Sequence, residues 1–271
     1  MRADGRGSKC VPNRAGVPLA LAATFLLMCR IALALLLAFG VPLAGMAGEA
    51  CPSAPHQQLT MPVTRAALAN GREVTIIAFG SSSTQGAGAS SPDRTYPAVL
   101  EARLHAALPA AHLRVLNRGL GGQEVTEMMA RLETDVLALG PALVIWQAGA
   151  NAVLRGMAPE IFIAAMADGI GRLRARGIDV VLMDSQRAPR ILNSPHFERF
   201  DTALREISTR LGVPLFSRAA LMQAWDASGT PHHTMLAPDD LHHNDRGYEC
   251  LARALAQSVV DATRPSLVAG R

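Results

Sequence analysis

The chain holds one lysine, Lys9, in 271 residues, and this scarcity limits the partners that it can have. Five of the 26 basic residues but only one of the 22 acidic residues lie before residue 48. From Gly48 onward 21 residues of each sign are left, so the formal charge of +4 belongs to the N-terminal leader. The rest of the chain lacks the lysine-rich patch that would attract nucleic acid, and we expect no nucleic-acid partner.

Nucleotide-binding motifs are incomplete in the glycine- and serine-rich segment 79–91. A phosphate-binding P-loop needs a lysine after its second glycine, but Ala87 stands there. The segment 86–91 matches only part of a dinucleotide fingerprint and lies too far beyond the preceding apolar run. The lipase elbow Gly-x-Ser-x-Gly fails as well, because Thr84 takes the place of its last glycine.

Charge is also sparse between residues 17 and 47, a nearly continuous apolar stretch that Arg30 interrupts. As a membrane-spanning anchor this stretch would carry a central arginine, which costs about 2.5–3.5 kcal/mol. We therefore expect a signal peptide that starts at Met28, with an apolar core at 31–43 and small residues up to Ala47. The protein is then periplasmic or secreted, and a retained leader that anchors it to a membrane is the alternative.

Only two of the four cysteines lie beyond this leader, Cys51 and Cys250. In an oxidising compartment they can pair, which would tie the start of the exported chain to its last predicted helix. The alternative is that Cys250 is a buried apolar residue. The expected organisation is a leader at 1–47, an extended proline-rich lead-in at 48–72, one domain at 73–262 and a tail at 263–271.

Five short apolar runs alternate with helical stretches from residue 73 onward. The predicted strands are 74–79, 113–116, 143–146, 180–183 and 213–216, and the predicted helices are 96–108, 124–139, 159–176, 197–211 and 244–260. Continuous apolar strands separated by helices indicate a parallel sheet that is covered on both faces. In such sheets functional residues gather at the carboxyl ends of the strands.

Polar segments follow the first three predicted strands and precede the last helix, at 79–86, 117–122, 147–151 and 238–244. In the last segment Asp239 stands three residues before His242. Its carboxylate can fold back to the imidazole Nδ1, which leaves Nε2 free to take a proton from a serine. Taken singly, each segment is also typical of a polar turn, a strand-to-helix turn or a helix N-cap.

The histidine-rich loop 232–243 allows a second interpretation, because histidine and aspartate are zinc ligands. The candidate ligands are His232, His233, Asp239, Asp240, His242 and His243. Adjacent histidines rarely point the same way, however, and the loop lacks the His-x3-His spacing of a helical metal site. A metal-dependent hydrolase is therefore an alternative rather than the favoured prediction.

Together, the four segments resemble the sequence blocks of the SGNH (GDSL-like) serine hydrolase superfamily over about residues 74–255. Residues 80–84 match the block Gly-Asp-Ser-x-Thr, and this match makes Ser82 the nucleophile. Gly122 and Asn151 match the second and third blocks, and Asp239 with His242 matches the Asp-x-x-His of the last block.

The chain departs from this family at two positions. Ser81 and Ala152 stand where the family has aspartate. Both positions lie beside residues of the predicted site and not among them. The departures therefore put local hydrogen bonding and the subfamily in question, but not the class of reaction.

The resemblance implies a three-layer α/β/α sandwich of the flavodoxin-like SGNH hydrolase type, with a five-stranded parallel sheet. It also implies ester hydrolysis without a cofactor, in which Ser82 attacks the carbonyl, His242 takes its proton and Asp239 orients His242. The oxyanion hole would combine the backbone N–H groups of Ser82 and Gly122 with the Asn151 amide. A non-catalytic binding module of the same fold is a further alternative.

The two longer connections, 184–196 and 226–241, bear on the substrate. Both are mostly polar, which suits a hydroxyl-rich alcohol or a small acyl group better than a fatty chain. Four apolar residues in them could instead line a modest acyl pocket, namely Ile191, Leu192, Met235 and Leu236. We expect a short-acyl esterase that acts on a small molecule or an acylated carbohydrate.

Overall fold

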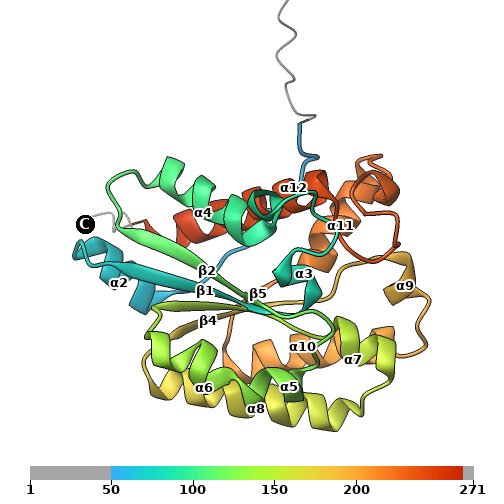
Figure 1. Cartoon of the computed structure of the whole chain (residues 1–271), viewed down its shortest axis with the longest axis horizontal. Helices are drawn as coiled ribbons and strands as arrows, with labels where there is room; N and C mark the ends of the chain where they lie inside the picture. The colour runs from blue at the N-terminus through green and yellow to red at the C-terminus, as the bar shows by residue number, and fades with distance from the viewer. Residues whose placement is uncertain (1–49, 265–271) are drawn as a thin grey trace, which may run out of the picture. The chain divides into compact units, whose positions relative to one another are not determined.

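Five parallel strands form the central sheet, in the order β2-β1-β3-β4-β5 (Figure 1). They are β1 (Val74–Gly80), β2 (Leu113–Gly119), β3 (Leu143–Gln147), β4 (Asp179–Met183) and β5 (Leu215–Phe216). The computed structural model describes residues 50–264, so the predicted leader at 1–47 and most of the predicted tail lie outside the described residues.

Helices cover both faces of the sheet, which confirms the predicted three-layer sandwich (Figure 1). One face carries α4 (Tyr96–Ala107), α11 (Arg218–Ala227) and α12 (Asp245–Thr263). The other carries α5 (Val125–Ala130), α6 (Leu132–Asp135), α7 (Ala150–Arg155), α8 (Pro159–Ala175) and α10 (Phe197–Leu211). None of the helices between residues 50 and 264 is long and apolar enough to span a membrane.

The burial of the strands explains why their sequences are so apolar. Every residue of β1, β3 and β4 is buried, as expected for central strands with helices on both faces. The edge strand β2 is buried only at Leu113 and Val115. Trp146, in the middle of the sheet, is fully buried and packs against Phe79 of β1 with 5.5 Å between ring centroids.

Two predicted elements differ from the structure. The lead-in is not extended throughout, because it contains α2 (Pro62–Ala69), which Pro62 begins and which Thr64 ties to Asp179 at the start of β4. The single helix predicted over 124–139 is broken into α5, α6 and a 3₁₀ turn, with Arg131 at the first break. The apolar spacing of this segment does not predict that the Arg131 side chain is buried.

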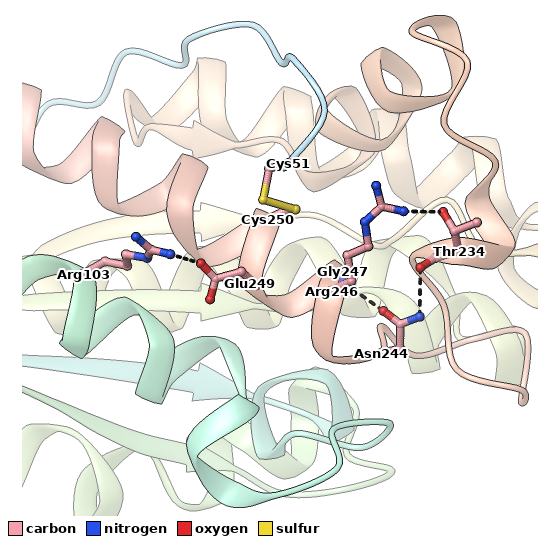
Figure 2. Close-up of a disulfide and its surroundings, with 8 residues drawn as sticks. All are labelled: Cys51, Arg103, Thr234, Asn244, Arg246, Gly247, Glu249 and Cys250. Atoms are coloured by element: carbon pink, nitrogen blue, oxygen red, sulfur yellow. Dashed lines mark hydrogen bonds and ion pairs between the residues drawn. A yellow bond between two sulfur atoms is a disulfide. The ribbon is translucent and has the colours of Figure 1, made fainter. Parts of the chain in front are cut away.

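The start of α12 follows the prediction closely. Asn244 is its N-cap, since the side-chain Oδ1 accepts a hydrogen bond from Gly247 N at 3.0 Å. Its Nδ2 donates to Thr234 O in the loop that precedes the helix, as Figure 2 shows. The cap therefore fixes both the first turn of α12 and the polypeptide just before it.

Cys51 and Cys250 form a disulfide, with 5.3 Å between their Cα atoms (Figure 2). The bond joins the lead-in to α12 across 199 residues. This confirms the pairing that was one of two interpretations of these cysteines.

Candidate active site

The register of the sheet brings three of the predicted segments to one place. Gly80 at the end of β1 pairs with Gly119 at the end of β2, and Leu120 N donates to Gly80 O. Strand order reverses between β1 and β3, and ligands of open α/β sheets bind where such a reversal occurs. A side chain at Gly119 would meet Gln85 N at 2.1 Å, so only glycine lets the short helix α3 (Ser82–Gln85) pack here.

Ser82, His242 and Asp239 lie in one hydrogen-bonded chain. His242 Nε2 is 2.7 Å from Ser82 Oγ, and His242 Nδ1 is 2.5 Å from Asp239 Oδ2. The other carboxylate oxygen accepts the backbone N–H groups of Leu241 and His242. Partial burial alone would raise the pKa of Asp239, but the hydrogen bonds from His242 and these N–H groups outweigh it and lower the pKa.

Contacts from a distant connection hold the histidine loop in place. Gln186 Nε2 donates to Leu241 O at 2.9 Å, and Arg190 N donates to Asp240 O. Asp240 adopts a φ of 53°, which is unusual for a residue other than glycine. The predicted connection 184–196 therefore does border the site. Gln186, which bonds the residue beside His242, was missed from the sequence because nothing in its neighbours indicates the contact.

The two adjacent histidines have opposite environments. His243 is buried, and its Nδ1 donates to Met235 O at 3.1 Å while Trp225 and Tyr248 pack around the ring. Burial, reinforced by the charge of Arg218, lowers the pKa of His243 to about 3. The imidazole is therefore neutral and part of the core, whereas that of His242 faces Ser82.

This divergence bears on the metal alternative. His232 and His233 are exposed in a 3₁₀ turn, away from the core position of His243. Within residues 50–264, no three histidine, cysteine, aspartate or glutamate side chains are grouped so that they could hold a metal ion.

The three predicted oxyanion donors lie on neighbouring segments, because a Cβ on Gly121 would be 4.0 Å from Ser82 Cβ and Asn151 bonds Gln123. In the described part of the chain, the backbone N–H groups of Ser82 and Gly122 have no hydrogen-bond acceptor. Gly122 has a φ of 77°, a conformation that favours glycine. Asn151, in the first turn of α7, donates one amide hydrogen to Gln123 O at 2.9 Å, so a second is left for a ligand.

Arg131 links these donors to the strand that leads to Ser82. Its guanidinium donates to Gly80 O at 3.0 Å and to Gln123 Oε1 at 2.6 Å, pairs with Asp135 and lies 4.4 Å from the Phe79 ring centroid. It thus contacts both β1 and the loop that Asn151 holds. An isolated arginine in a helix gives no sequence signal for this role.

The structure accounts for both departures from the family pattern. Ser81, which replaces an aspartate, is buried and donates through N and Oγ to Gln147 Oε1, both at 3.0 Å. The same oxygen accepts Thr84 Oγ1 at 3.2 Å, so Gln147 ties the nucleophile segment to β3. Ala152 is 2% exposed in the core side of α7, where a carboxylate would be buried.

Several solved structures share the fold of this chain. A two-domain esterase active on acetylated mannans superimposes with a TM-score of 0.66 at 20% identity, covering 78% of this chain and 56% of that one. An acetyl xylan esterase gives 0.61 at 21% identity over 69% and 100% of the two chains. An acetylxylan esterase from Geobacillus stearothermophilus gives 0.60 at 20% identity over 70% and 96%.

This chain spans little more than half of the two-domain esterase, and at such identities the likeness concerns the fold. No curated protein matches the sequence. The model of the Non-GDSL lipase-like family, in contrast, matches residues 49–265, nearly all of the described chain. The resemblance to SGNH-type hydrolases is therefore confirmed at the level of family and fold, and this chain belongs to the Non-GDSL lipase-like family.

Proposed function

We propose that this protein is an exported serine esterase that removes short acyl groups, acetyl above all, from carbohydrate. The observation that carries the proposal is the chain of hydrogen bonds from Asp239 through His242 to Ser82, at 2.5 and 2.7 Å. A nucleophile, its base and a group that orients the base are the three parts that acyl transfer by serine requires.

The proposed reaction uses only groups of this chain. Ser82 Oγ attacks the ester carbonyl while His242 Nε2 takes its proton, and Asp239 stabilises the imidazolium. The N–H groups of Ser82 and Gly122, with the Asn151 amide, receive the negative oxygen of the tetrahedral intermediate. His242 then gives the proton to the departing alcohol, and water releases the acyl group by the same steps.

The surroundings of the site favour a small acyl group. Of the four apolar residues that could have lined an acyl pocket, Ile191, Met235 and Leu236 are buried in the core and only Leu192 is exposed. The related folds that act on acetylated mannan and xylan support a carbohydrate as the alcohol.

Replacement of the nucleophile tests the mechanism. Ser82→Ala should abolish ester hydrolysis and retain the far-UV circular dichroism of the wild type, because it removes only the atom that forms the covalent bond. A serine-directed phosphonate should label Ser82 in the wild type. Labelling of Ser81 or Ser83 instead, or activity that chelators abolish and zinc restores, would contradict the assignment.

The acyl preference is tested with a series of p-nitrophenyl esters from acetate to palmitate. We expect kcat/KM to be highest for acetate and to fall as the chain lengthens, because no deep apolar groove is built beside Ser82 from the four candidate residues. A steady rise toward palmitate would identify a lipid site instead.

Export is the remaining part of the proposal. The apolar segment 31–43 and the disulfide between Cys51 and Cys250 both fit an oxidising compartment outside the cytoplasm. Mass spectrometry of the native protein should find its N-terminus near Gly48 or Cys51. An N-terminus at Met1 in the membrane fraction would instead show a retained anchor.

A further inference from the structure

Arg155 lies one helical turn beyond Asn151 on α7, at the rim of the candidate oxyanion hole. Residues four apart lie on the same face of a helix, so both side chains point toward the loop 119–124. A Cβ on Gly122 would be 3.5 Å from Arg155 Nη2, which places the guanidinium directly beside that glycine. The charge therefore stands next to one of the three groups that would bind the oxyanion.

The hydrogen-bonding capacity of this guanidinium is uncommitted. Among residues 50–264 it donates to no hydrogen-bond acceptor, and its two ion pairs, with Glu124 and Glu127, are 3.9 and 3.7 Å long. Both carboxylates are already occupied by backbone N–H groups, because they form the capping box of α5. The Arg155 side chain is also 52% exposed, so a ligand can reach guanidinium N–H donors that no hydrogen bond among residues 50–264 uses.

The charges around Arg155 indicate which chemical class of ligand could bind its guanidinium. Glu124 and Glu127 together carry two negative charges against one positive charge. An anionic group would be repelled by them, whereas an uncharged, oxygen-rich group would be accepted. The planar guanidinium presents parallel N–H donors, which suit two neighbouring oxygen atoms such as adjacent sugar hydroxyls.

We propose that Arg155 forms a binding subsite beside the oxyanion hole for the hydroxyl oxygens of the sugar that carries the ester. This inference rests on the proposed esterase function and specifies its substrate: a neutral acylated sugar with a free hydroxyl near the ester. The contact lies outside the reacting atoms, so its main effect is on the binding of sugar esters.

The test compares two substrates in two variants. Arg155→Ala should lower kcat/KM for acetylated xylo-oligosaccharide about 10-fold relative to kcat/KM for p-nitrophenyl acetate, mainly through a higher KM. The reason is that only the sugar substrate makes the charge-assisted hydrogen bonds that this variant lacks. Arg172→Ala is the matched control, because Arg172 is also a partly exposed arginine paired with a glutamate, Glu133, but on α8. It should leave the ratio as it is in the wild type.

The other outcomes are distinguishable. An equal loss on both substrates, or no loss on either, would overturn the subsite and leave Arg155 as support for the loop or as a surface residue. A wild type that cleaves p-nitrophenyl acetate but no acetylated oligosaccharide would leave the esterase standing and overturn the subsite. A wild type that cleaves no ester would refute the proposed function, and the subsite with it.

Discussion

Ser82 and Asn151 follow directly from strands of the sheet, whereas His242 stands on a loop that no strand leads into. Ser82 and Asn151, with Gly122, form the proposed oxyanion half of the site, and the register of β1, β2 and β3 sets their positions. The second group, Asp239 and His242, forms the histidine half. It is held by Gln186, 55 residues away from Leu241, and by the cap of α12.

The two halves of the site hold their side chains in position in different ways. In the oxyanion half, backbone pairing and the contacts of Arg131 and Gln147 fix the positions, so side chains there have little freedom. In the histidine half, the Asp239 carboxylate closes a local turn and distant residues fix that turn in space. We expect mutations in the first half to act chiefly on catalysis and mutations around the second to act on stability as well.

The largest expected effect is on catalysis in the histidine half. His242→Ala should lower kcat by about 10³–10⁴-fold, because it removes the only group within hydrogen-bond reach of Ser82 Oγ among the described residues. His233→Ala, in the same loop but exposed, should keep the wild-type kcat. Steady-state kinetics on p-nitrophenyl acetate measures kcat of both variants. Equal losses of kcat in both would mean that the whole loop, and not His242 alone, supports catalysis.

The disulfide should affect stability and not catalysis. In the chain-entropy model, a bond that closes about 200 residues stabilises the folded state by roughly 5 kcal/mol, less any strain. Replacing Cys51 and Cys250 together by serine should therefore lower Tm by about 10 °C or more, in a scan of both proteins at one scan rate. Because the bond acts mainly on the unfolded chain, kcat well below the transition should match the wild type. A lower kcat there would show that the disulfide also shapes the histidine half.

The oxyanion half should respond more weakly than His242 but without loss of stability. Asn151→Ala removes one proposed oxyanion donor and should lower kcat by about 10²–10³-fold. KM and Tm should change little, since Asn151 is on the rim of α7 and its fold contact is one hydrogen bond to Gln123 O. An unchanged kcat would remove Asn151 from the site.

The smallest expected effect is a pH dependence that comes from His243. Its pKa in the folded protein is about 3, below the value of about 6.5 in an unfolded chain. Below pH 6.5 the unfolded state gains a proton that the folded state does not, so stability is lost as the pH falls from 6.5 toward 3. His243→Phe removes the titrating imidazole and one of the two donors to Met235 O, of which Asn244 N is the other. Loss of that one hydrogen bond costs about 0.5–1.5 kcal/mol at pH 7.

The measurement is Tm of both proteins between pH 7 and pH 4. The difference in Tm between the wild type and the His243→Phe variant should shrink as the pH falls. Only in the wild type does proton binding to residue 243 of the unfolded chain lower the stability. Parallel curves would mean that His243 does not control the acid stability of the histidine half.

The sequence predicts those features that depend on neighbours along the chain. Apolar runs locate all five strands, and the spacing of Asp239 and His242 predicts the turn that the structure contains. The cap at Asn244 follows from the same local logic. Local sequence patterns do not predict contacts between segments that are far apart in the chain. Arg131, Gln147 and Gln186 are near the site only because of which strands and loops become neighbours.

Gln57 gives the lead-in a role at the edge of the sheet. Its side-chain amide accepts from Ser217 N at 2.6 Å and donates to Ser217 O at 3.0 Å, just after the short strand β5. Those are the two backbone groups that the next strand of a sheet would pair with. Unpaired edges invite the strands of other molecules and so promote aggregation. By occupying this position with one side chain, the lead-in ends the sheet at β5 and protects the exposed edge from self-association.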